Sequence, residues 1–587
     1  MPPKNTNLRW EIINPSRQHE SFGAQSQNVA IPAPILTILA NRGITDPQDI
    51  DNFLNPSLDQ LPPPQLLLGL DRAVNILTEA WLRKTPVLVH GDYDADGVTA
   101  TALLVKFFRE INLPVFYHLP NRLNEGYGLN LESLPVLRKL PGIAEHSAPI
   151  LLTVDCGITN HAEIAAANDL GFRVIVTDHH QPDPNLPAAE AIINPHQPGC
   201  TFPFRELAGV GVAFYLAAGL RAEMVRQGVW EKKAQPNLKR FLDLVAIGTV
   251  ADMVSLGGAN RILVKIGLEV INQAPSPGIK ALLEQIGHGA GKATSETIAY
   301  QMAPRINAAG RTGAAEQALL LLLAEDEKSA TVLAEVLGQA NQLRKDLSES
   351  MYNSARIQAE EQFAAGRFAL VVSGEGWSPG IAGLVATKLA REFWRPTVVL
   401  VLNVEDQVRG SARSVGKLDI LACLRECSAY LNKYGGHPAA AGVSLDFAKV
   451  AVFHESLNES VAMAASPTDM EPRLEIDLWA DPGEVMEESI LNYVQNLGPY
   501  GNGNQEPIFG SRPEGVKLSE VKKVGTDSLR FRIEAPGKGL SGIGFGLARW
   551  AETAKEGPLC LAYTITRNNF RGNESWEVRL VDVKIPL

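Results

Sequence analysis

Cysteine is scarce in this chain, and the few cysteines are scattered. The 587 residues contain five, at positions 156, 200, 423, 427 and 560. They do not form the paired clusters that bind structural zinc, and the one near pair, Cys423 and Cys427, lies in a helical pattern without histidine partners. We therefore expect buried, reduced thiols and no zinc-finger type of site.

Long apolar runs and an excess of basic charge are also absent. Apolar stretches such as 318–324 are far too short to span a bilayer, and the N-terminus lacks the apolar segment of a signal peptide. We expect a reducing, cytoplasmic location and no membrane association. The net charge of −11 gives no global sign of nucleic-acid binding, but an acidic protein can still carry a local basic groove.

The chain is too long for a single hydrophobic core. From Thr85 onward, short β-rich runs alternate with amphipathic helical segments, for instance 98–110 and 161–170, and this alternation predicts a parallel, doubly wound α/β sheet. The expected strands lie at 86–90, 115–119, 150–154, 173–177 and 191–194.

Farther along the chain the pattern of apolar, Gly and Pro residues changes twice. A stretch with almost no Gly or Pro predicts one long connecting helix, and a second, smaller α/β pattern follows it. The C-terminal part is rich in short strands, which is typical of a small barrel or sandwich. We expect an N-terminal extension that packs on the first α/β domain (1–75), that α/β domain (76–324), the connecting helix (325–365), the second α/β domain (366–465) and the C-terminal barrel (466–587).

Acidic residues stand where three of the expected strands end. Taken singly, each would be explained as a turn former or a helix cap. The carboxyl ends of parallel strands meet at one edge of a sheet, however, so the side chains should converge and repel each other unless divalent cations neutralise them. The residues are Asp92, Asp94, Asp96, Asp155, Asp178, His179 and His180.

A further acid, Asp252, lies in the apolar stretch LVAIGTVADMV, where a buried charge is costly unless it binds something. Carboxylates with some imidazole suit Mn²⁺ or Mg²⁺, and two such ions support hydrolysis at phosphorus. No Ser-His-Asp spacing, P-loop or dinucleotide fingerprint competes for this role. The residues alone therefore favour a dinuclear phosphoesterase.

The motifs GDYDADG, VDCGIT, TDHHQP and GTVADM together resemble the DHH phosphoesterase superfamily, and within it the RecJ family of single-stranded-DNA-specific exonucleases. Further landmarks of that family, such as LAGVGVAF, APRINAAGRTG, YGGHPAAAG and LGPYGNGNQEPIF, extend the resemblance from about residue 35 to the end. It implies that the second α/β domain is DHHA1-like and that the C-terminal barrel is an OB-fold.

The resemblance also implies the roles of the acidic residues. Asp178 would act close to the metals, and His180 would contact the scissile phosphate. Asp92 is expected to orient a ligand or a water molecule. The implied ligands of the two divalent ions, Mn²⁺ or Mg²⁺, are His90, Asp94, Asp96, Asp155, His179 and Asp252.

Substrate residues are implied in both α/β domains, since guanidinium groups, hydroxyls and glycine N–H groups bind phosphate well. The alternative is that some of the glycines only form turns. Two positions depart from the family pattern, Ser378 in place of His and Lys417 in place of Gly. The implied residues are Arg122, Tyr127, Arg305, Asn307, Arg311, Ser411, Arg413, Gly435, Gly436 and His437.

In the C-terminal region, basic residues and aromatic residues are candidates for contacts with a single strand. Core packing is the alternative for most of the aromatics. The candidates are Lys517, Lys522, Lys523, Arg530, Arg532, Phe531, Phe545 and Phe570.

The resemblance thus implies a metal-dependent 5′→3′ exodeoxyribonuclease of DNA repair and recombination that releases 5′-mononucleotides. Its expected partners are single-stranded DNA with a 5′ end and a single-strand-binding protein, and a monomer is expected. Two alternatives remain: a superfamily phosphodiesterase for short oligonucleotides or cyclic dinucleotides, and a non-catalytic binding protein whose site has decayed.

Overall fold

The computed structural model describes residues 8–14, 31–121, 125–230, 235–289, 291–311, 314–402, 407–466, 468–535, 538–570 and 573–586. The chain divides into two compact units. One comprises Asp51–Leu343 and Leu497–Gln505, and the other comprises Met1–Ile50, Arg344–Asn496 and Glu506–Leu587. Each unit is described by itself.

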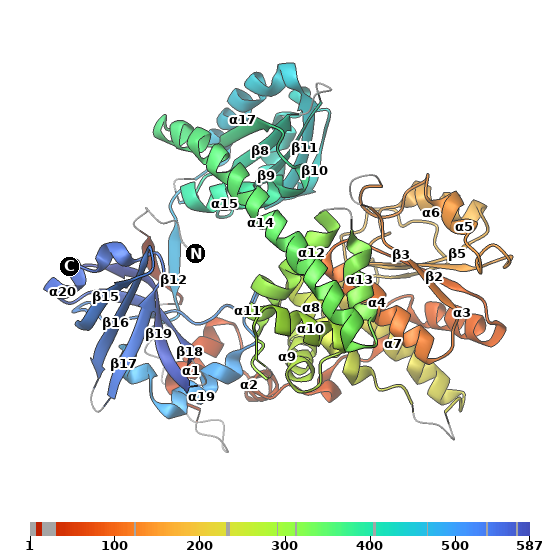
Figure 1. Cartoon of the computed structure of the whole chain (residues 1–587), viewed down its shortest axis with the longest axis horizontal. Helices are drawn as coiled ribbons and strands as arrows, with labels where there is room; N and C mark the ends of the chain where they lie inside the picture. Colours follow the sequence, from red (N-terminus) through yellow and green to blue (C-terminus); the bar gives the residue numbers. More distant parts are fainter. Residues whose placement is uncertain are drawn as a thin grey trace. The chain divides into compact units, whose positions relative to one another are not determined.

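The first unit contains a parallel sheet of five strands in the order β3-β2-β4-β5-β6 (Figure 1). Its strands fall where the apolar runs predicted them, which confirms the parallel α/β architecture. The central strands β2 and β4 are buried along their whole length, as their continuous apolar sequence requires. The strands are β2 (Val87–Gly91), β3 (Val115–His118), β4 (Ile150–Val154), β5 (Arg173–Thr177) and β6 (Ala191–Ile193).

Helices cover both faces of this sheet. Alternate strand residues such as Val89 and Leu152 pack with α3, α4, α7 and α8 in one core, while Leu88 and Leu151 pack with α5 and α6 in the other. The helices of this unit are α2 (Pro47–Leu54, which continues from the other unit), α3 (Leu70–Arg83), α4 (Ala95–Glu110), α5 (Leu134–Arg138), α6 (His161–Asp169), α7 (Gly209–Arg226), α8 (Leu242–Ala251), α9 (Gly258–Gln273), α10 (Pro277–Gln285), α11 (Ser295–Thr297), α12 (Ala303–Arg311) and α13 (Ala315–Leu323).

The long helix expected over 325–365 is present as α14 (Glu327–Ala364), which contributes residues to both units. None of the described helices is long and apolar enough to cross a membrane.

The second α/β region is a five-stranded mixed sheet in the order β10-β11-β9-β8-β7 (Figure 1). Helix α15 (Pro379–Phe393) packs on one face of β7 and β8, whereas α16 (Ile420–Glu426) and α17 (Val450–Ala464) pack on the opposite face. The strands are β7 (Leu370–Glu375), β8 (Thr397–Leu402), β9 (Gln407–Arg413), β10 (Lys433–His437) and β11 (Ala440–Asp446).

The C-terminal region is a seven-stranded sheet in the order β13-β14-β18-β19-β17-β16-β15. This confirms the strand-rich domain predicted there. Short helices α18 (Pro482–Val485), α19 (Glu488–Leu497) and α20 (Thr553–Glu556) accompany it. The strands are β13 (Leu478–Trp479), β14 (Phe509–Gly510), β15 (Leu518–Val524), β16 (Ser528–Ala535), β17 (Lys538–Gly544), β18 (Cys560–Phe570) and β19 (Asn573–Lys584).

Part of the N-terminal extension packs on the first α/β domain as expected, because Leu67, Leu70 and Ala73 belong to its core, whereas the described residues up to Ile50 belong to the other unit. Strand β1 (Arg9–Ile12) pairs in parallel with β12 (Arg473–Ile476), and α1 (Ala33–Asn41) belongs to the same unit. Leu8 packs with Leu474 and Ile476 in a small core, so burial of apolar side chains ties this segment to the C-terminal region.

Candidate metal centre

Asp94 and Asp96 lie where β2 gives way to α4. The side chain of Asp94 caps the helix, because its Oδ1 accepts hydrogen bonds from the N–H groups of Asp96 at 3.0 Å and Gly97 at 3.1 Å. Helix α4 therefore begins at Ala95, three residues before the expected start, and its N-terminus faces the carboxylates.

Asp96 is held by the N-terminus of α7. The N–H groups of Gly209 and Val210 donate to its two carboxylate oxygens over 2.6 and 2.9 Å. A Cβ atom at position 209 would lie 2.6 Å from the Cβ and Oδ1 atoms of Asp155, so only glycine allows this approach. Burial and the neighbouring charge of Asp94 raise the pKa of Asp96 to about 7.

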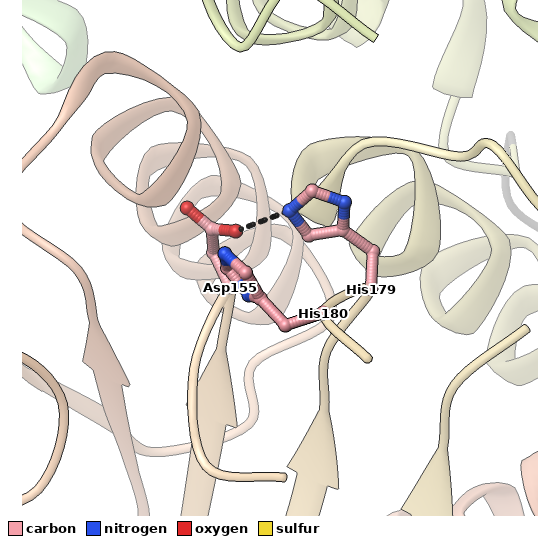
Figure 2. A group of neighbouring side chains, drawn as sticks. All are labelled: Asp155, His179 and His180. Atoms are coloured by element: carbon pink, nitrogen blue, oxygen red, sulfur yellow. Dashed lines mark ion pairs between the residues drawn. The ribbon is translucent and has the colours of Figure 1, made fainter. Parts of the chain in front are cut away.

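Asp155 and His179 face each other in the same cluster (Figure 2). The Oδ1 atom of Asp155 lies 3.0 Å from Nε2 of His179, yet neither buried atom has a hydrogen-bond partner among the described residues. His179 is hydrogen-bonded to the backbone of Leu207 through its other ring nitrogen, and burial lowers its pKa to about 3. The neutral ring thus presents a lone pair to a carboxylate, an arrangement that a cation would satisfy.

Three groups of side chains in this cluster have ligand atoms within 4.8 Å of one another. Burial and the charges of Asp96 and Asp94 raise the pKa of Asp155 well above its usual value and that of Asp252 to about 9. Such crowded carboxylates fit two divalent ions. The groups are Asp96, His179 and Asp252; Asp92, Asp94 and Asp155; and Asp155, His179 and His180.

Asp178 orients the ring of His180, the second histidine of the cluster. Its Oδ1 atom lies 2.7 Å from Nδ1 of His180, and its Oδ2 accepts the Ile158 N–H at 2.9 Å. Burial alone would lower the pKa of His180, but Asp178 raises it to about 9. The His180 ring packs edge-on against Tyr127, whose hydroxyl lies 3.3 Å from Nδ1 of His180. The structure thus brings the predicted pair Asp178 and His180 together with Tyr127.

His90, expected as a metal ligand, lies outside all three groups. The ring is completely buried, its Nε2 atom lies 3.2 Å from the carbonyl oxygen of Gly128, and burial lowers its pKa to about 3. Its Nδ1 atom has no hydrogen-bond partner among the described residues, and the ligand role of His90 stays a prediction. Asp92, in contrast, was expected only to orient a ligand, and its carboxylate lies within ligand distance of Asp94 and Asp155.

The substrate residues expected in this unit have different surroundings. Arg122 lies outside the described residues. Asn307 accepts the Ala95 N–H through Oδ1 at 2.8 Å, so its side chain helps to fix the start of α4. Arg305 donates to Gln285 Oε1 at 3.0 Å and to a backbone carbonyl, while Arg311 is the last residue of α12.

In the second α/β region, Ser411 and Arg413 project from the face of the sheet on which α15 packs, and both lie close to Gly383 of that helix. His437, the last residue of β10, is exposed. Both glycines lie within β10: Gly435 is exposed with open space around it, whereas Gly436 has φ +140° and a Cβ atom there would lie 2.4 Å from the Ala440 carbonyl oxygen.

The C-terminal candidates separate by burial. Phe531 is only 1% exposed and belongs to the core, while Phe545 is 46% exposed beside Arg579. The side chain of Phe570 lies outside the described part of the chain. The basic residues Lys517, Lys522, Lys523, Arg530 and Arg532 are all exposed.

Two features of the site were not anticipated. The N-terminus of α7 clamps Asp96, and the only sequence signal for it is the glycine pair in LAGVG. The second is the segment Leu497–Gln505, which docks on the loop that follows Asp252. Asn502 Nδ2 donates to the Met253 carbonyl at 2.7 Å, and the Leu256 N–H donates to the Asn502 carbonyl at 2.7 Å.

Three family models match successive parts of the chain. The DHH family N-terminal domain matches residues 86–249, the DHHA1 domain matches residues 364–463, and the RecJ OB domain matches residues 476–582. The first match contains most of the carboxylate cluster.

Two relatives are each 35% identical to the chain. The single-stranded-DNA-specific exonuclease RecJ of Bacillus subtilis (strain 168) matches over 541 residues, 92% of this chain and 66% of that protein. The enzyme of the same name from Escherichia coli (strain K12) matches over 565 residues, 93% of this chain and 95% of that protein. The chain thus spans about two thirds of the first relative and nearly all of the second.

Solved structures agree with these relatives. RecJ from Thermus thermophilus in complex with Mn²⁺ has a TM-score of 0.81 and 30% identity, over 99% of this chain and 80% of that chain. Its complex with Mg²⁺ gives a TM-score of 0.75 and 27% identity, over 99% of this chain and 79% of that chain. Identity at this level along nearly the whole length, with all three domain models in order, shows that the chain belongs to the RecJ family of single-stranded-DNA-specific exonucleases.

Proposed function

We propose that this protein degrades single-stranded DNA from its 5′ end to 5′-mononucleotides by metal-dependent phosphodiester hydrolysis, in DNA repair and recombination. The observation that carries the proposal is the intact cluster of carboxylates and His179 in a chain of the RecJ family. A protein with a decayed site would have lost part of this set.

The residues present fit two divalent ions. Asp96, His179 and Asp252 would hold one, and Asp92, Asp94 and Asp155 would hold the other, with Asp155 close enough to His179 to be shared. When bound, such ions lower the pKa of water and stabilise charge on a phosphate. The RecJ of T. thermophilus binds Mn²⁺ and Mg²⁺ in its solved complexes, and we propose the same ions for this chain.

His180 supplies a proton donor, which ionised carboxylates cannot. Asp178 keeps its ring oriented and protonated at neutral pH, so it is suited to contact a phosphate oxygen or to give a proton to a leaving oxygen. The Tyr127 hydroxyl lies 3.3 Å from Nδ1 of that ring and donates to the Asp155 carbonyl oxygen at 3.3 Å, and Tyr127 stays a candidate for substrate contact beside the cluster.

The remaining substrate residues are proposals of the same kind. Ser411 and Arg413 lie on one face of the sheet beside Gly383 of α15, where Arg413 also donates to Thr387 Oγ1 at 3.1 Å, and a hydroxyl with a guanidinium suits a terminal phosphate. Gly435 and His437 border this place, and Arg122, Arg305 and Arg311 are further candidates for the first α/β domain. We also keep the five-part domain division as a proposal, with the described residues 8–14 and 31–50 grouped with Arg344–Asn496 and Glu506–Leu587.

Location and partners follow from the proposed substrate. Because the substrate is DNA, we propose that the protein acts in the cytoplasm. A monomeric state and cooperation with a single-strand-binding protein are proposed from the family resemblance, and size-exclusion chromatography and a binding assay with that protein test them.

The test uses 5′-phosphorylated single-stranded, duplex and 3′-blocked DNA with Mn²⁺, Mg²⁺ or EDTA. We expect mononucleotides from the 3′-blocked single strand, no attack on the blunt duplex, and no product with EDTA. Cleavage restricted to dinucleotides or cyclic dinucleotides would favour the short-substrate alternative, and binding without any cleavage would favour the non-catalytic one.

A further inference from the structure

The second α/β region has an open sheet face beyond the edge of α15. Residues directly opposite each other in neighbouring antiparallel strands point to the same face. Val399 and Val401 of β8 pack in one core with α15, and their partners on β9 are Ser411 and Arg409. The face that α15 covers at β7 and β8 therefore continues across β9, β11 and β10.

Three cross-strand rows of residues occupy this open face. Successive rows are two residues apart along each strand, which is about 6.6 Å. The first row is His437, Ala440 and Arg413, the second is Gly435, Gly442 and Ser411, and the third is Lys433, Ser444 and Arg409.

The second row forms a flat floor. Gly435 and Gly442 are exposed, and a Cβ atom added at either residue would meet nothing within 4 Å. A depression of about 370 Å³ lies over this row and reaches the third row, and a second depression of about 470 Å³ adjoins it. Arg409, Lys433 and Ser444 line both depressions, so the two form one groove that begins at Ser411.

The third row is strongly basic. Arg409 and Lys433 are exposed, and neither forms an ion pair with any residue that the structure describes. Asp446, at the end of β11, is engaged by Asn432 at 2.7 Å and by Lys449 at 3.4 Å. The two cations and the hydroxyl of the third row are therefore suited to an anion, in a chain of net charge −11.

This anion cannot be a backbone phosphate of a strand that ends in a 5′-monophosphate. In the proposed function, the terminal phosphate lies at Ser411 and Arg413, and the next phosphate along the strand is the scissile one at the carboxylate cluster. Only an uncharged sugar and base lie between these two phosphates. An anion over the third row must therefore be joined to the terminal phosphate on the side away from the strand.

We propose that the third row, Arg409, Lys433 and Ser444, binds the β- and γ-phosphates of a single strand that carries a 5′-triphosphate. The α-phosphate of that strand takes the terminal-phosphate site at Ser411 and Arg413. The inference rests on the proposed function, because it extends that site. Two phosphoanhydride links separate the α- and γ-phosphates, which suits donors that lie one row apart, and the glycine floor lets the charged chain lie close to the sheet.

Single strands with a 5′-polyphosphate end are thus a second substrate class, and the bond that breaks is unchanged. Water adds to the phosphorus of the first phosphodiester, the bond from that phosphorus to the 3′ oxygen of the first nucleoside breaks, and this oxygen takes a proton. The products are a nucleoside 5′-triphosphate and a shortened strand with a 5′-monophosphate. Both phosphoanhydride bonds stay intact, so no further reactant is needed.

The binding test compares the wild-type protein with the double variant Arg409→Gln, Lys433→Gln in EDTA. Fluorescence anisotropy measures the Kd of oligothymidylate with a 5′-monophosphate and of the same oligonucleotide with a 5′-triphosphate. We expect the wild type to bind the triphosphorylated strand about tenfold more tightly, because the added phosphates gain charge-assisted hydrogen bonds. The double variant should bind the two strands about equally and keep the wild-type Kd for the monophosphorylated strand.

Arg425→Gln is the matched control, because Arg425 is an exposed arginine of α16, which packs on the opposite face of the sheet. This variant should keep the wild-type preference for the triphosphorylated strand. Equal weakening of both strands in the double variant would assign Arg409 and Lys433 to the terminal phosphate itself and overturn the proposal. An unchanged preference in the double variant would overturn it too.

The cleavage test uses the triphosphorylated strand with Mn²⁺ and separates the products by anion-exchange chromatography. We expect thymidine 5′-triphosphate as the first product, followed by thymidine 5′-monophosphate. Release of pyrophosphate or orthophosphate before any nucleotide would show that an anhydride bond is attacked instead. A triphosphorylated strand that stays intact would show that this end is rejected, and either result contradicts the proposal.

Failure of the proposed function gives a different result. If the wild-type protein releases no mononucleotides from the monophosphorylated strand with Mn²⁺, the proposed function fails whatever the variants do. If it degrades that strand and shows no preference for the triphosphorylated one, only the polyphosphate site is disproved.

Discussion

At the scale of single residues, the facing pair of Asp155 and His179 defines the chemistry of the site. The Oδ1 atom of Asp155 and the Nε2 atom of His179 lie 3.0 Å apart and have no hydrogen-bond partner among the described residues, and Asp96 and Asp252 lie nearby. This arrangement is unfavourable in the protein alone and favourable around a cation. Stability and metal binding should therefore respond in opposite directions when one carboxylate is removed.

The Asp155→Asn variant should show this opposition. We expect the metal-free protein to gain about 2–4 °C in Tm, because folding of the variant no longer requires this carboxyl to take up a proton or to bury a charge that its neighbours disfavour. Mn²⁺ affinity and DNA cleavage should fall by about 100-fold or more. Differential scanning fluorimetry and calorimetric titration with Mn²⁺ measure the two effects.

Asp243→Asn is the matched control. Asp243 is also buried, and burial raises its pKa too, but it lies outside the three ligand groups, accepts the Leu244 N–H at 2.7 Å and lies near the positive charge of Lys106. Its loss should lower stability and leave Mn²⁺ affinity unchanged. An Asp155→Asn protein that binds Mn²⁺ like the wild type would contradict the assignment of Asp155 as a ligand.

The raised pKa values of Asp96, about 7, and Asp252, about 9, predict how pH acts on the metal-free protein. The unfolded chain releases protons from these carboxyls near pH 4, whereas the folded protein still holds them. The stability of the folded protein therefore falls as the pH rises through about 7 and 9. Bound Mg²⁺ replaces the protons. The increase in Tm on adding saturating Mg²⁺ should therefore grow from about pH 6 to about pH 9, and an increase independent of pH would contradict this account.

At the scale of elements, helix ends and one docked segment hold the ligands in place. The N-termini of α4 and α7 surround Asp96, and Asn307 of α12 fixes the first residue of α4. The segment Leu497–Gln505, which is distant in the sequence, is hydrogen-bonded to the loop after Asp252. Arg261 adds to this docking, since its guanidinium donates to the carbonyls of Leu497 and Gly498.

Asn502→Ala should loosen that loop. We expect Mn²⁺ affinity to fall by about 10- to 100-fold, because Asp252 loses the support that orients it. Calorimetric titration measures the affinity. Asn458→Ala, which removes a similar side-chain contact to the backbone of Phe368 in the second α/β region, should leave it unchanged. Equal loss of affinity in both variants would point to a general folding defect.

At the scale of the whole molecule, the two ends of the chain meet. Trp10 of β1 donates its indole N–H to Asp582 at 2.8 Å, lies 6.4 Å from the ring of Trp479, and has the Lys584 ammonium 4.8 Å from its ring centre. Strand β1 thereby packs on the C-terminal region through its pairing with β12 and the contacts of Trp10.

Trp10→Ala should destabilise this region by about 2 kcal/mol, less than a fully buried tryptophan would, because the ring is only partly covered. Hydrogen exchange should accelerate at the amides of β12, which pairs with β1. Mn²⁺ affinity should not change, since the cluster lies in the other unit. A loss of Mn²⁺ binding with normal exchange at β12 would refute this division.

The sequence alone determined the parallel sheet, the long helix and the acidic residues at strand ends. These follow from hydrophobic periodicity and from the rule that the carboxyl ends of parallel strands share one edge, which are local or topological properties. Asp94, Asp96, Asp155 and His179 came together for that reason. The order of the quoted motifs along the chain likewise identified the family.

Only the tertiary structure decided the rest, because it depends on contacts between residues far apart in the sequence. Asn502 and Met253 are 249 residues apart, and Asn307 and Ala95 are 212 apart, so no local pattern announces either bond. The burial of His90 beside Gly128, outside the three ligand groups, is likewise a matter of packing. Side-chain direction and long-range docking turned a list of candidate ligands into a specific set, and they assigned the N-terminal strand to the C-terminal region.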